Sequence, residues 1–367
     1  MRLVSLRANG FRNLEPFTLG LDAPFVVFHG ENGQGKTNAL EAIHLLAALK
    51  PLRGRGRELV RFGASSAVVR GEVAFGGVTR AHEVRLEGSG REARVDDKSV
   101  RSILDYFDGF RAVVFVPSDL DVVSGEPARR RAWIDRAAFT ASPSHLELVL
   151  RVRRIIAQKS ALLRGIAADL GLLDALDADL AATGARLSAR RASMLEQLMP
   201  YVSAVYRDIA GEDEPVAMSW RGDAAGADLA SRADALAEAL ASARPDELRR
   251  GVVLRGPQRD EVRIGLRGQD ARTYASRGQI RSLVLSLKLA ELLAARDRGV
   301  VPPFLLDDVG SELDAGRMNR LVGVLTEVGA QLFATTTDPR WLSALPRAET
   351  LRVTVRRGIL TPDLGDW

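Results

Sequence analysis

The chain has 367 residues, of which 46% are apolar and 27% are charged, with a formal net charge of +5 and a pI near 9.8. This balance excludes a disordered or fibrous protein, and the length favours one main domain with a second lobe. Because cysteine is absent, disulfides and thiolate metal sites are excluded, and any metal is expected to be held by oxygen.

The excess of positive charge favours an acidic partner, most commonly nucleic acid. Arginine greatly outnumbers lysine, however, and together with the abundant alanine this is equally well explained by codon composition. The chain begins MRLVSLRANGF, and no run of about 18 apolar residues follows anywhere. We therefore expect a cytoplasmic protein with no membrane partner.

Residues 2–28 predict three short strands, in LVSLRA, FTLGL and PFVVFHG. The third leads into GENGQGKT, and apolar residues at helical spacing predict a helix from Lys36 to Leu49. Alternation over residues 67–95 predicts an antiparallel sheet that flanks the main one, and VVFVP at 113–117 predicts a buried strand.

Between Ser118 and about Leu248 the pattern becomes helical and predicts an inserted lobe. Its helices are expected to be too short for a long coiled-coil arm, because glycine and proline would interrupt them. The expected interruptions are at Gly165, Gly171, Gly184 and Pro200.

The chain after Pro257 predicts a strand in EVRIGL, a helix from about Gly278 to Arg296, a helix near 315–326, and strands in QLFATTT and LRVTV. The predicted domains are residues 1–117 (N-terminal part of lobe I), 118–257 (lobe II), 258–299 (a linking strand and helix) and 300–367 (C-terminal part of lobe I).

A glycine-rich loop lies between the third predicted strand and the helix that follows it. It matches G-x-x-x-x-G-K-[ST] in full, through Gly30, Glu31, Asn32, Gly33, Gln34, Gly35, Lys36 and Thr37, with Asn38 next. Backbone N–H groups and the helix N-terminus would surround the phosphates of ATP, Lys36 would reach the β- and γ-phosphates, and Thr37 would bind Mg²⁺. The strand and helix on either side argue against a chance glycine turn.

The stretch PFLLDD at 303–308 supplies the carboxylates that such a loop needs. An apolar strand ends there in Asp307 and Asp308, which would be costly to bury without a cation. We assign Asp307 to the Mg²⁺ shell, and Asp308 to orienting or deprotonating the attacking water. The alternative is that both acids begin a solvated loop.

A third motif, Ala275-Ser276-Arg277-Gly278-Gln279, lies just before an apolar helix, as does the signature sequence of ABC-type ATPases. In that superfamily the serine and glycine cap the γ-phosphate held by the opposite subunit, so ATP closes a homodimer. We assign Ser276, Gly278 and Gln279 to this role. An ordinary helix N-cap is the alternative.

Two further segments resemble parts of the same superfamily. Ser311, Leu313 and Asp314 in VGSELD look like its D-loop, which lies along the dimer interface. The segment from Thr335 to Asp338 occupies the place of its switch loop, where Thr337 would sense the nucleotide. Threonine hydroxyls at this place can equally cap the end of a strand.

Taken together, FRN, GENGQGKTNALEAI, FVPSDLDVVSGEPARRRAWID, YASRGQIRSLVLSLKLAE and LLDDVGSELD resemble the RecF family over nearly the whole chain. The resemblance implies an α/β fold: an ABC-type ATPase head with a mixed P-loop sheet, a flanking antiparallel sheet and a mainly helical second lobe without long coiled-coil arms. It also implies a role in DNA repair.

In that role the resemblance implies an ATP-dependent homodimer on duplex DNA and gap junctions, with single strands as an alternative substrate. Work with RecO and RecR in loading RecA is implied as well. Arg12, in FRN, is expected either to touch the nucleotide or to be structural.

Several departures from the wider superfamily bear on mechanism. Pro117, Ser118 and Asp119 stand where a Gln loop is expected, the second acid is Asp308 rather than glutamate, and the switch loop has no histidine. A shorter acid reaches the water less well, so hydrolysis is predicted to be slow. The alternative of an ATP-binding subunit of a membrane transporter would need an LSGGQ signature, a Gln loop and a switch histidine.

Two arginine clusters are the candidate DNA contacts: Arg53, Arg55 and Arg57 after the P-loop helix, and Arg129 and Arg130 in lobe II. A solvated charged face is the alternative for both. Arg131 adjoins the second cluster, and a pair with Asp135 at i,i+4 is the alternative for it.

Overall fold

The structure, a computed structural model, describes residues 1–88, 90–165, 169–211, 213–308 and 314–363. It divides into two compact units. Unit 1 comprises Met1–Asp119, Val205–Gly211 and Leu285–Trp367, and unit 2 comprises Leu120–Ala204 and Glu212–Val284. The predicted linking segment 258–299 falls partly in each unit, so its separate status stays a prediction.

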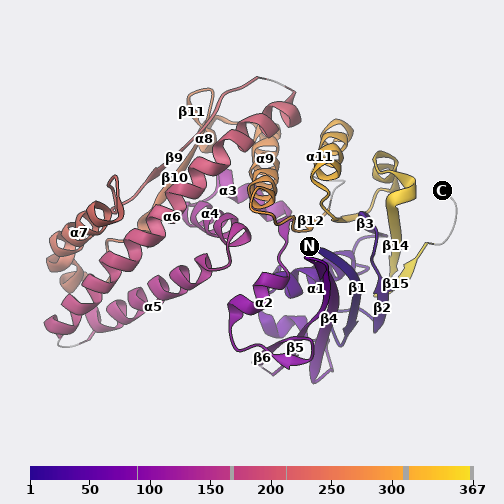
Figure 1. Cartoon of the computed structure of the whole chain (residues 1–367), viewed down its shortest axis with the longest axis horizontal. Coiled ribbons are helices and arrows are strands. Elements are labelled where there is room, and N and C mark those ends of the chain that lie inside the picture. Colours follow the sequence, from indigo (N-terminus) through magenta and orange to yellow (C-terminus); the bar gives the residue numbers. More distant parts are fainter. Residues whose placement is uncertain (89, 166–168, 212, 309–313, 364–367) are drawn as a thin grey trace. The chain divides into compact units, whose positions relative to one another are not determined.

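Unit 1 contains a six-stranded mixed sheet in the order β15-β14-β3-β13-β12-β8. Figure 1 labels β3, β12, β14 and β15 of this sheet. Its strands are β3 Phe25–His29, β8 Val113–Phe115, β12 Phe304–Leu306, β13 Leu332–Thr336, β14 Thr350–Arg356 and β15 Ile359–Pro362. All neighbours pair in parallel except β14 with β15. The inner strands are buried on both faces, which explains why they read as continuous apolar runs.

A second, antiparallel sheet of unit 1 has the order β2-β1-β4-β5-β6-β7. Its strands are β1 Arg2–Asn9, β2 Phe17–Gly20, β4 Ser66–Phe75, β5 Val78–Glu87, β6 Gly90–Val95 and β7 Lys98–Ser99. Buried and exposed side chains alternate along β5, where Val84 and Leu86 face inward and Arg85 faces solvent. This confirms the predicted flanking sheet.

Helix α1 (Lys36–Ala48) lies between these two sheets, because it contacts β3 and β13 of the first and β4 and β5 of the second. Leu40, Ile43 and Leu46 are fully buried, and so are residues on the other sides of the helix. Unit 1 also holds α2 (Ile103–Gly109) and α11 (Ala315–Val328).

One side chain joins the two sheets. The amide of Gln331, just before β13, accepts from Leu3 N at 2.8 Å and donates to the carbonyls of Leu3, Leu21 and Ala23 at 2.8–3.1 Å. Gln331 is 4% exposed, so these bonds satisfy a buried polar group that would otherwise be costly.

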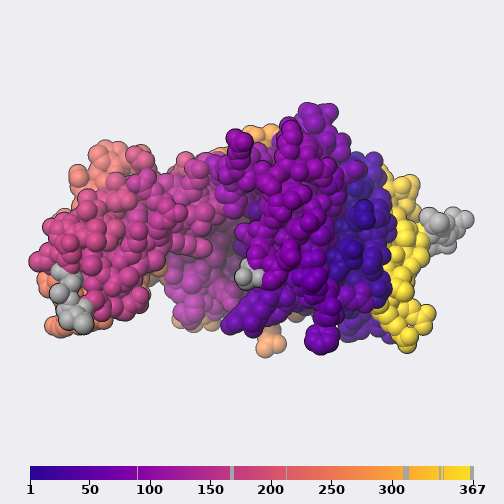
Figure 2. Space-filling view, turned by 90° about the horizontal axis from the view of Figure 1, so that it is seen from below, coloured from indigo at the N-terminus to yellow at the C-terminus, as the bar shows by residue number. Residues whose placement is uncertain are grey.

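The N- and C-terminal segments of unit 1 pack together. Gly358 accepts a hydrogen bond from Glu15 N at 2.9 Å, and β15 contacts β2. Figure 2 shows the yellow surface of the C-terminal strands directly beside the indigo surface of the N-terminal residues.

Unit 2 combines helices with a three-stranded antiparallel sheet in the order β11-β10-β9. Its elements are α3 Asp121–Ser124, α4 Pro127–Ala141, α5 His145–Leu163, β9 Val216–Arg221, α7 Leu229–Arg250, β10 Glu261–Leu266, β11 Gln269–Asp270 and α8 Ala271–Tyr274. Two helices, α6 (Leu170–Ala210) and α9 (Arg277–Arg296), contribute residues to both units. Strand β9 was not predicted.

Helix α6 corrects one prediction, because it runs for 41 residues through Gly171, Gly184 and Pro200. Gly184 allows close packing, since a Cβ there would lie 2.8 Å from Leu236 and 2.9 Å from Pro257. Packing against α5 and α7 in a shared apolar core outweighs the weak helix propensity of these residues. Gly165, by contrast, does follow the end of α5.

Within the part of the chain that the structure describes, no helix combines the length and apolar character needed to cross a membrane.

Candidate functional site

The glycine-rich loop turns tightly between β3 and α1. Gly30 (φ 148°) passes the Val355 carbonyl so closely that a Cβ would lie 2.4 Å from its oxygen, and Gly35 (φ 116°) packs against Leu14. The Gln34 carbonyl accepts from Gly358 N at 2.9 Å, which ties the loop to the turn between β14 and β15. Glu31, Asn32 and Gly33 form its exposed tip.

Lys36 and Thr37 stand at the first turn of α1. The Lys36 ammonium donates to the Glu31 carbonyl at 2.7 Å, and the side chain is largely buried. Burial lowers the pKa of Lys36, while the nearby carboxylates of Asp308 and Asp307 oppose this shift. A cation held over the loop in this way suits a polyphosphate.

Asp307 and Asp308 follow β12, next to the P-loop helix. Asp307 Oδ1 accepts from Thr37 Oγ1 at 2.8 Å and from Thr335 Oγ1 at 2.8 Å, and Asp307 is only 6% exposed. Thr335 Oγ1 in turn accepts from Asp308 N at 2.8 Å. The ends of β12, β13 and the P-loop therefore meet in one hydrogen-bonded cluster.

Asp308 has the left-handed conformation, with φ 55°. Such a backbone costs about 1–3 kcal/mol for a residue other than glycine and often occurs at functional sites. Thr335 holds this turn, a function that the sequence alone did not indicate. The signal available was the run of three threonines at the end of a strand.

The Arg12 guanidinium makes four hydrogen bonds within unit 1. Its guanidinium donates to the buried Glu41 carboxylate at 2.8 and 3.1 Å, and to the carbonyls of Glu58 and Arg53 at 3.0 Å each. These contacts support the structural alternative for Arg12. Asn38 donates to Asn13 Oδ1 at 2.7 Å, so it bonds the first turns of α1 to the FRN segment.

The signature segment forms the beginning of α9. Ser276 N donates to Gln279 Oε1 at 2.8 Å and Gln279 N donates to Ser276 Oγ at 3.2 Å, a reciprocal capping box. Gln279 also donates to Glu214 at 3.0 Å. The N-cap interpretation is therefore correct as local geometry, and it leaves Ser276 exposed at the positive end of a 20-residue helix, with Gly278 half-buried.

Asp314 caps α11 by accepting from Arg317 N at 2.9 Å, whereas Ser311 and Leu313 lie outside the described residues. Thr337 is exposed after β13, and Thr336 forms a local turn by accepting from Asp338 N at 3.0 Å. The nucleotide roles of Asp314 and Thr337 stay predictions.

The two arginine clusters differ. Arg53, Arg55 and Arg57 are exposed, although the Arg53 guanidinium also donates to Asn38 Oδ1 at 3.3 Å. Arg129 is exposed and 4.0 Å from Asp121. In contrast, Arg130 is 6% exposed and is bound to Glu261 at 2.7 Å, which supports a structural role.

The alternative pair of Arg131 with Asp135 is replaced by contacts with residues far along the chain. Arg131 donates to the Asp260 carbonyl at 2.7 Å. The Asp135 carboxylate is bound by Arg191 at 2.8 Å and by His145 at 2.9 Å. Burial alone would raise the pKa of Asp135, but the hydrogen bonds from Arg191 and His145 lower it to about 2.

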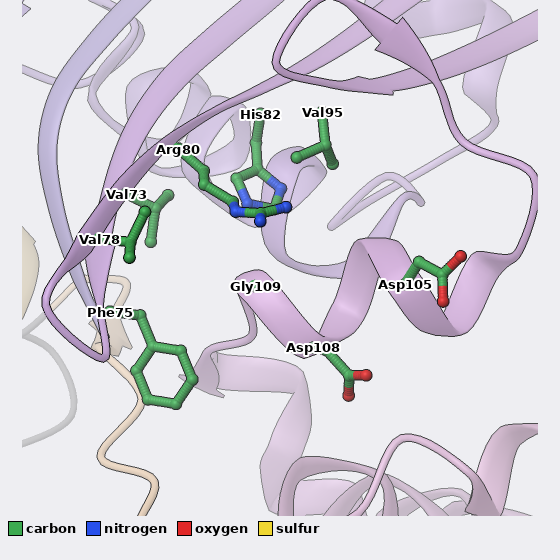
Figure 3. Close-up of a pocket in the computed structure, with 9 residues that line it drawn as sticks. All are labelled: Val73, Phe75, Val78, Arg80, His82, Val95, Asp105, Asp108 and Gly109. Carbon is green, nitrogen blue, oxygen red and sulfur yellow. The ribbon is translucent and has the colours of Figure 1, made fainter.

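A hollow of about 210 Å³ lies on unit 1 between the β4–β5 hairpin and α2. Figure 3 shows the residues that line it. His82 at its base is fully buried, and neither ring nitrogen has a hydrogen-bond partner among the described residues. A Cβ at Gly109 would lie 2.6 Å from the ring. Burial lowers the pKa of His82 to about 4, so the ring is neutral at pH 7.

The chain matches the family model described as "RecF/RecN/SMC N terminal domain" over residues 2–361. It is 41% identical over 367 residues to the DNA replication and repair protein RecF of Myxococcus xanthus (strain DK1622), covering 98% of this chain and 96% of that one. The chain belongs to the RecF family. The corresponding RecF of Geobacter sulfurreducens is 38% identical, with coverage of 99% and 100%.

Among solved structures, the chain is similar to the recombination mediator protein RecF bound to ATPrS in the RecFOR pathway, with TM-score 0.89, 28% identity and coverage of 99% and 98%. The RecF–ATP structure gives 0.88. A head domain of Smc bound to ScpA gives 0.59 at 14% identity and shares the fold alone. The ABC-type head predicted from the RecF resemblance is thereby confirmed.

Proposed function

We propose that the chain is an ATP-driven DNA-binding protein of recombinational repair, in which ATP pairs two copies around DNA and hydrolysis releases them. The observation that carries this proposal is the buried cluster of Thr37, Asp307 and Thr335 beside a complete P-loop. Family membership and the similarity to the RecF–ATP structure support it.

The nucleotide would lie on the P-loop, with Lys36 and the N-terminus of α1 facing its phosphates. Thr37 and Asp307 fit Mg²⁺, because a hydroxyl and a buried carboxylate oxygen lie 2.8 Å apart and this ion prefers oxygen ligands. When bound, Mg²⁺ supplies positive charge to the phosphate oxygens. Asp308, held by Thr335, orients or deprotonates the attacking water.

Pairing would use the exposed N-cap of α9. Ser276 and the backbone N–H groups at Gly278 present donors at a helix N-terminus, which favours the γ-phosphate held by a second copy. Gln279 holds the cap in shape, while Asp314 would lie at the interface and Thr337 near the phosphate. ATP thus becomes part of the contact between two copies.

Slow turnover follows from the second acid. Asp308 has one methylene fewer than glutamate, which moves its carboxylate back from the water, so hydrolysis serves as a timer rather than a source of rapid cycling. The relatives named RecF and the RecFOR pathway support RecO and RecR as partners in loading RecA at gaps. The transporter alternative is not favoured by these matches.

The test is sedimentation velocity of an Asp308→Asn variant with MgATP, with and without fluorescent gapped duplex. Blocking hydrolysis should trap an ATP-bound dimer that carries the DNA with it. Lys36→Ala/Asp308→Asn serves as the control that should stay monomeric. A dimer that does not bind DNA would contradict the repair function but not the ATPase assignment. A protein that stays monomeric would contradict the pairing role of Ser276.

A further inference from the structure

A basic hollow on unit 1 brings together cations from two distant segments. Its volume is about 550 Å³, and Lys50, Arg55 and Arg57 from the chain after α1 line it together with Arg91 from the start of β6. Leu45, Leu49, Leu59 and Leu86 form its apolar floor, and none of the described lining residues carries a carboxylate. Nothing in the order of residues along the chain groups Arg91 with Arg55 and Arg57.

Of the acids next to lining residues along the chain, Glu92 is bonded to other side chains, whereas Glu58 and Glu87 are exposed. The Glu58 carboxylate lies against Gly54, where a Cβ would be 2.1 Å from its oxygen. Glu92, the neighbour of Arg91, accepts from Arg94 at 2.9 Å and from Ser99 at 2.7 Å. Exposed cations that line one hollow repel one another and favour an anionic ligand.

The basic hollow is held in place by α1. Leu52 N and Arg53 N donate to Glu41 Oε1 at 3.0 and 3.1 Å, and the Arg12 guanidinium binds the carbonyls of Arg53 and Glu58. The backbone is therefore fixed on both sides of Arg55 and Arg57. Less conformational entropy is lost on binding when a site is preorganised in this way.

We propose that the basic hollow binds the phosphodiester backbone of nucleic acid, with Lys50, Arg55, Arg57 and Arg91 each neutralising phosphate. The inference rests on the proposed function and locates its DNA contact on the surface of unit 1. Four cations exceed the charge of about −2 on one free phosphate, so the hollow suits successive phosphates of a polymer. The planar guanidinium forks of the arginines match phosphate oxygens in pairs.

The test compares Arg55→Ala/Arg91→Ala with the matched control Arg7→Ala/Arg356→Ala, which removes two exposed arginines of unit 1 that do not line the hollow. Affinity for a short duplex is measured with MgATP between about 50 and 200 mM salt. Each lost phosphate contact lowers the slope of log affinity against log salt by about 0.9, so the first variant should lose about 2. Over that range its affinity falls about 12-fold less than that of the wild type.

Wild-type binding with an unchanged slope in Arg55→Ala/Arg91→Ala would overturn the basic hollow alone. Equal competition by inorganic phosphate at matched phosphate concentration would also overturn it, because the site would then hold a free anion. Absence of ATP-dependent DNA binding by the wild type would instead remove the proposed function. Arg55→Lys/Arg91→Lys should keep the slope, and unchanged ATP affinity in every variant confirms an intact nucleotide site.

Discussion

Glu41 offers a quantitative test of how the segment of residues 52–58, which carries Arg55 and Arg57, is fixed to α1. Its fully buried carboxylate accepts from Arg12 Nε and Nη2 at 2.8 and 3.1 Å, and from the amides of Leu52 and Arg53 at 3.0 and 3.1 Å. Glu41→Gln keeps the shape and one acceptor oxygen. It removes the charge and turns the other acceptor into a donor that faces a guanidinium.

The magnitude follows from these four bonds. A charge-assisted hydrogen bond contributes about 1.5–3 kcal/mol, and breaking a buried ion pair costs about 3–5 kcal/mol. One bond is lost, the two backbone bonds become neutral and the remaining Arg12 bond loses its anionic acceptor, so we expect local stability to fall by about 3 kcal/mol. This corresponds to roughly 100-fold in the population of the open segment.

Hydrogen exchange at the amides of Leu52 and Arg53 measures the population of the open segment directly, because both amides donate to Glu41. In Glu41→Gln we expect their exchange to accelerate by roughly 100-fold relative to core amides of β13. Glu58→Gln removes the same charge from an exposed side chain of the same segment and should have little effect. Acceleration of less than threefold in Glu41→Gln would refute the anchoring role.

Three further outcomes are expected. Lys36→Ala should abolish useful ATP binding in an equilibrium titration, and unchanged affinity would contradict the P-loop assignment. Ser276→Arg should retain ATP binding yet prevent ATP-dependent dimerisation in sedimentation, whereas Ser276→Thr, which keeps the capping hydroxyl, should pair normally. His82 has a pKa of about 4, below the ordinary value of about 6.5, so protonation of the unfolded chain lowers stability as pH falls through this window. His82→Phe should therefore remove about 2 kcal/mol of the decline between pH 7 and pH 4.5, seen in urea unfolding; an equally steep decline would assign it to other groups.

Local patterns predicted much of unit 1. The apolar runs of β3, β12 and β13 mark strands buried on both faces, and the P-loop lies where a strand turns into a helix. These features depend on neighbours in sequence, so one chain suffices to find them. The pairing of Asp307 with Thr37 also follows, because the carboxyl ends of parallel strands meet at one edge.

Features set by distant partners were not predictable in the same way. Arg130 is a structural residue because Glu261, 131 positions later, lies beside it. The course of α6 through Gly184 depends on Leu236 and Pro257, which make glycine a packing residue rather than a helix breaker. Strand β9 exists through its pairing with β10, and its own sequence lies within a stretch of helical character.

Gln331 couples the local unfolding of the two sheets of unit 1. Its single amide bonds to the backbone of Leu3, Leu21 and Ala23, so the edge of one sheet cannot loosen without exposing the start of β13 in the other. The amide proton of Leu3, which is bonded to a side chain, should therefore exchange with solvent as slowly as the ladder protons of β13. Two sheets that are separate in topology would therefore open together in partial unfolding.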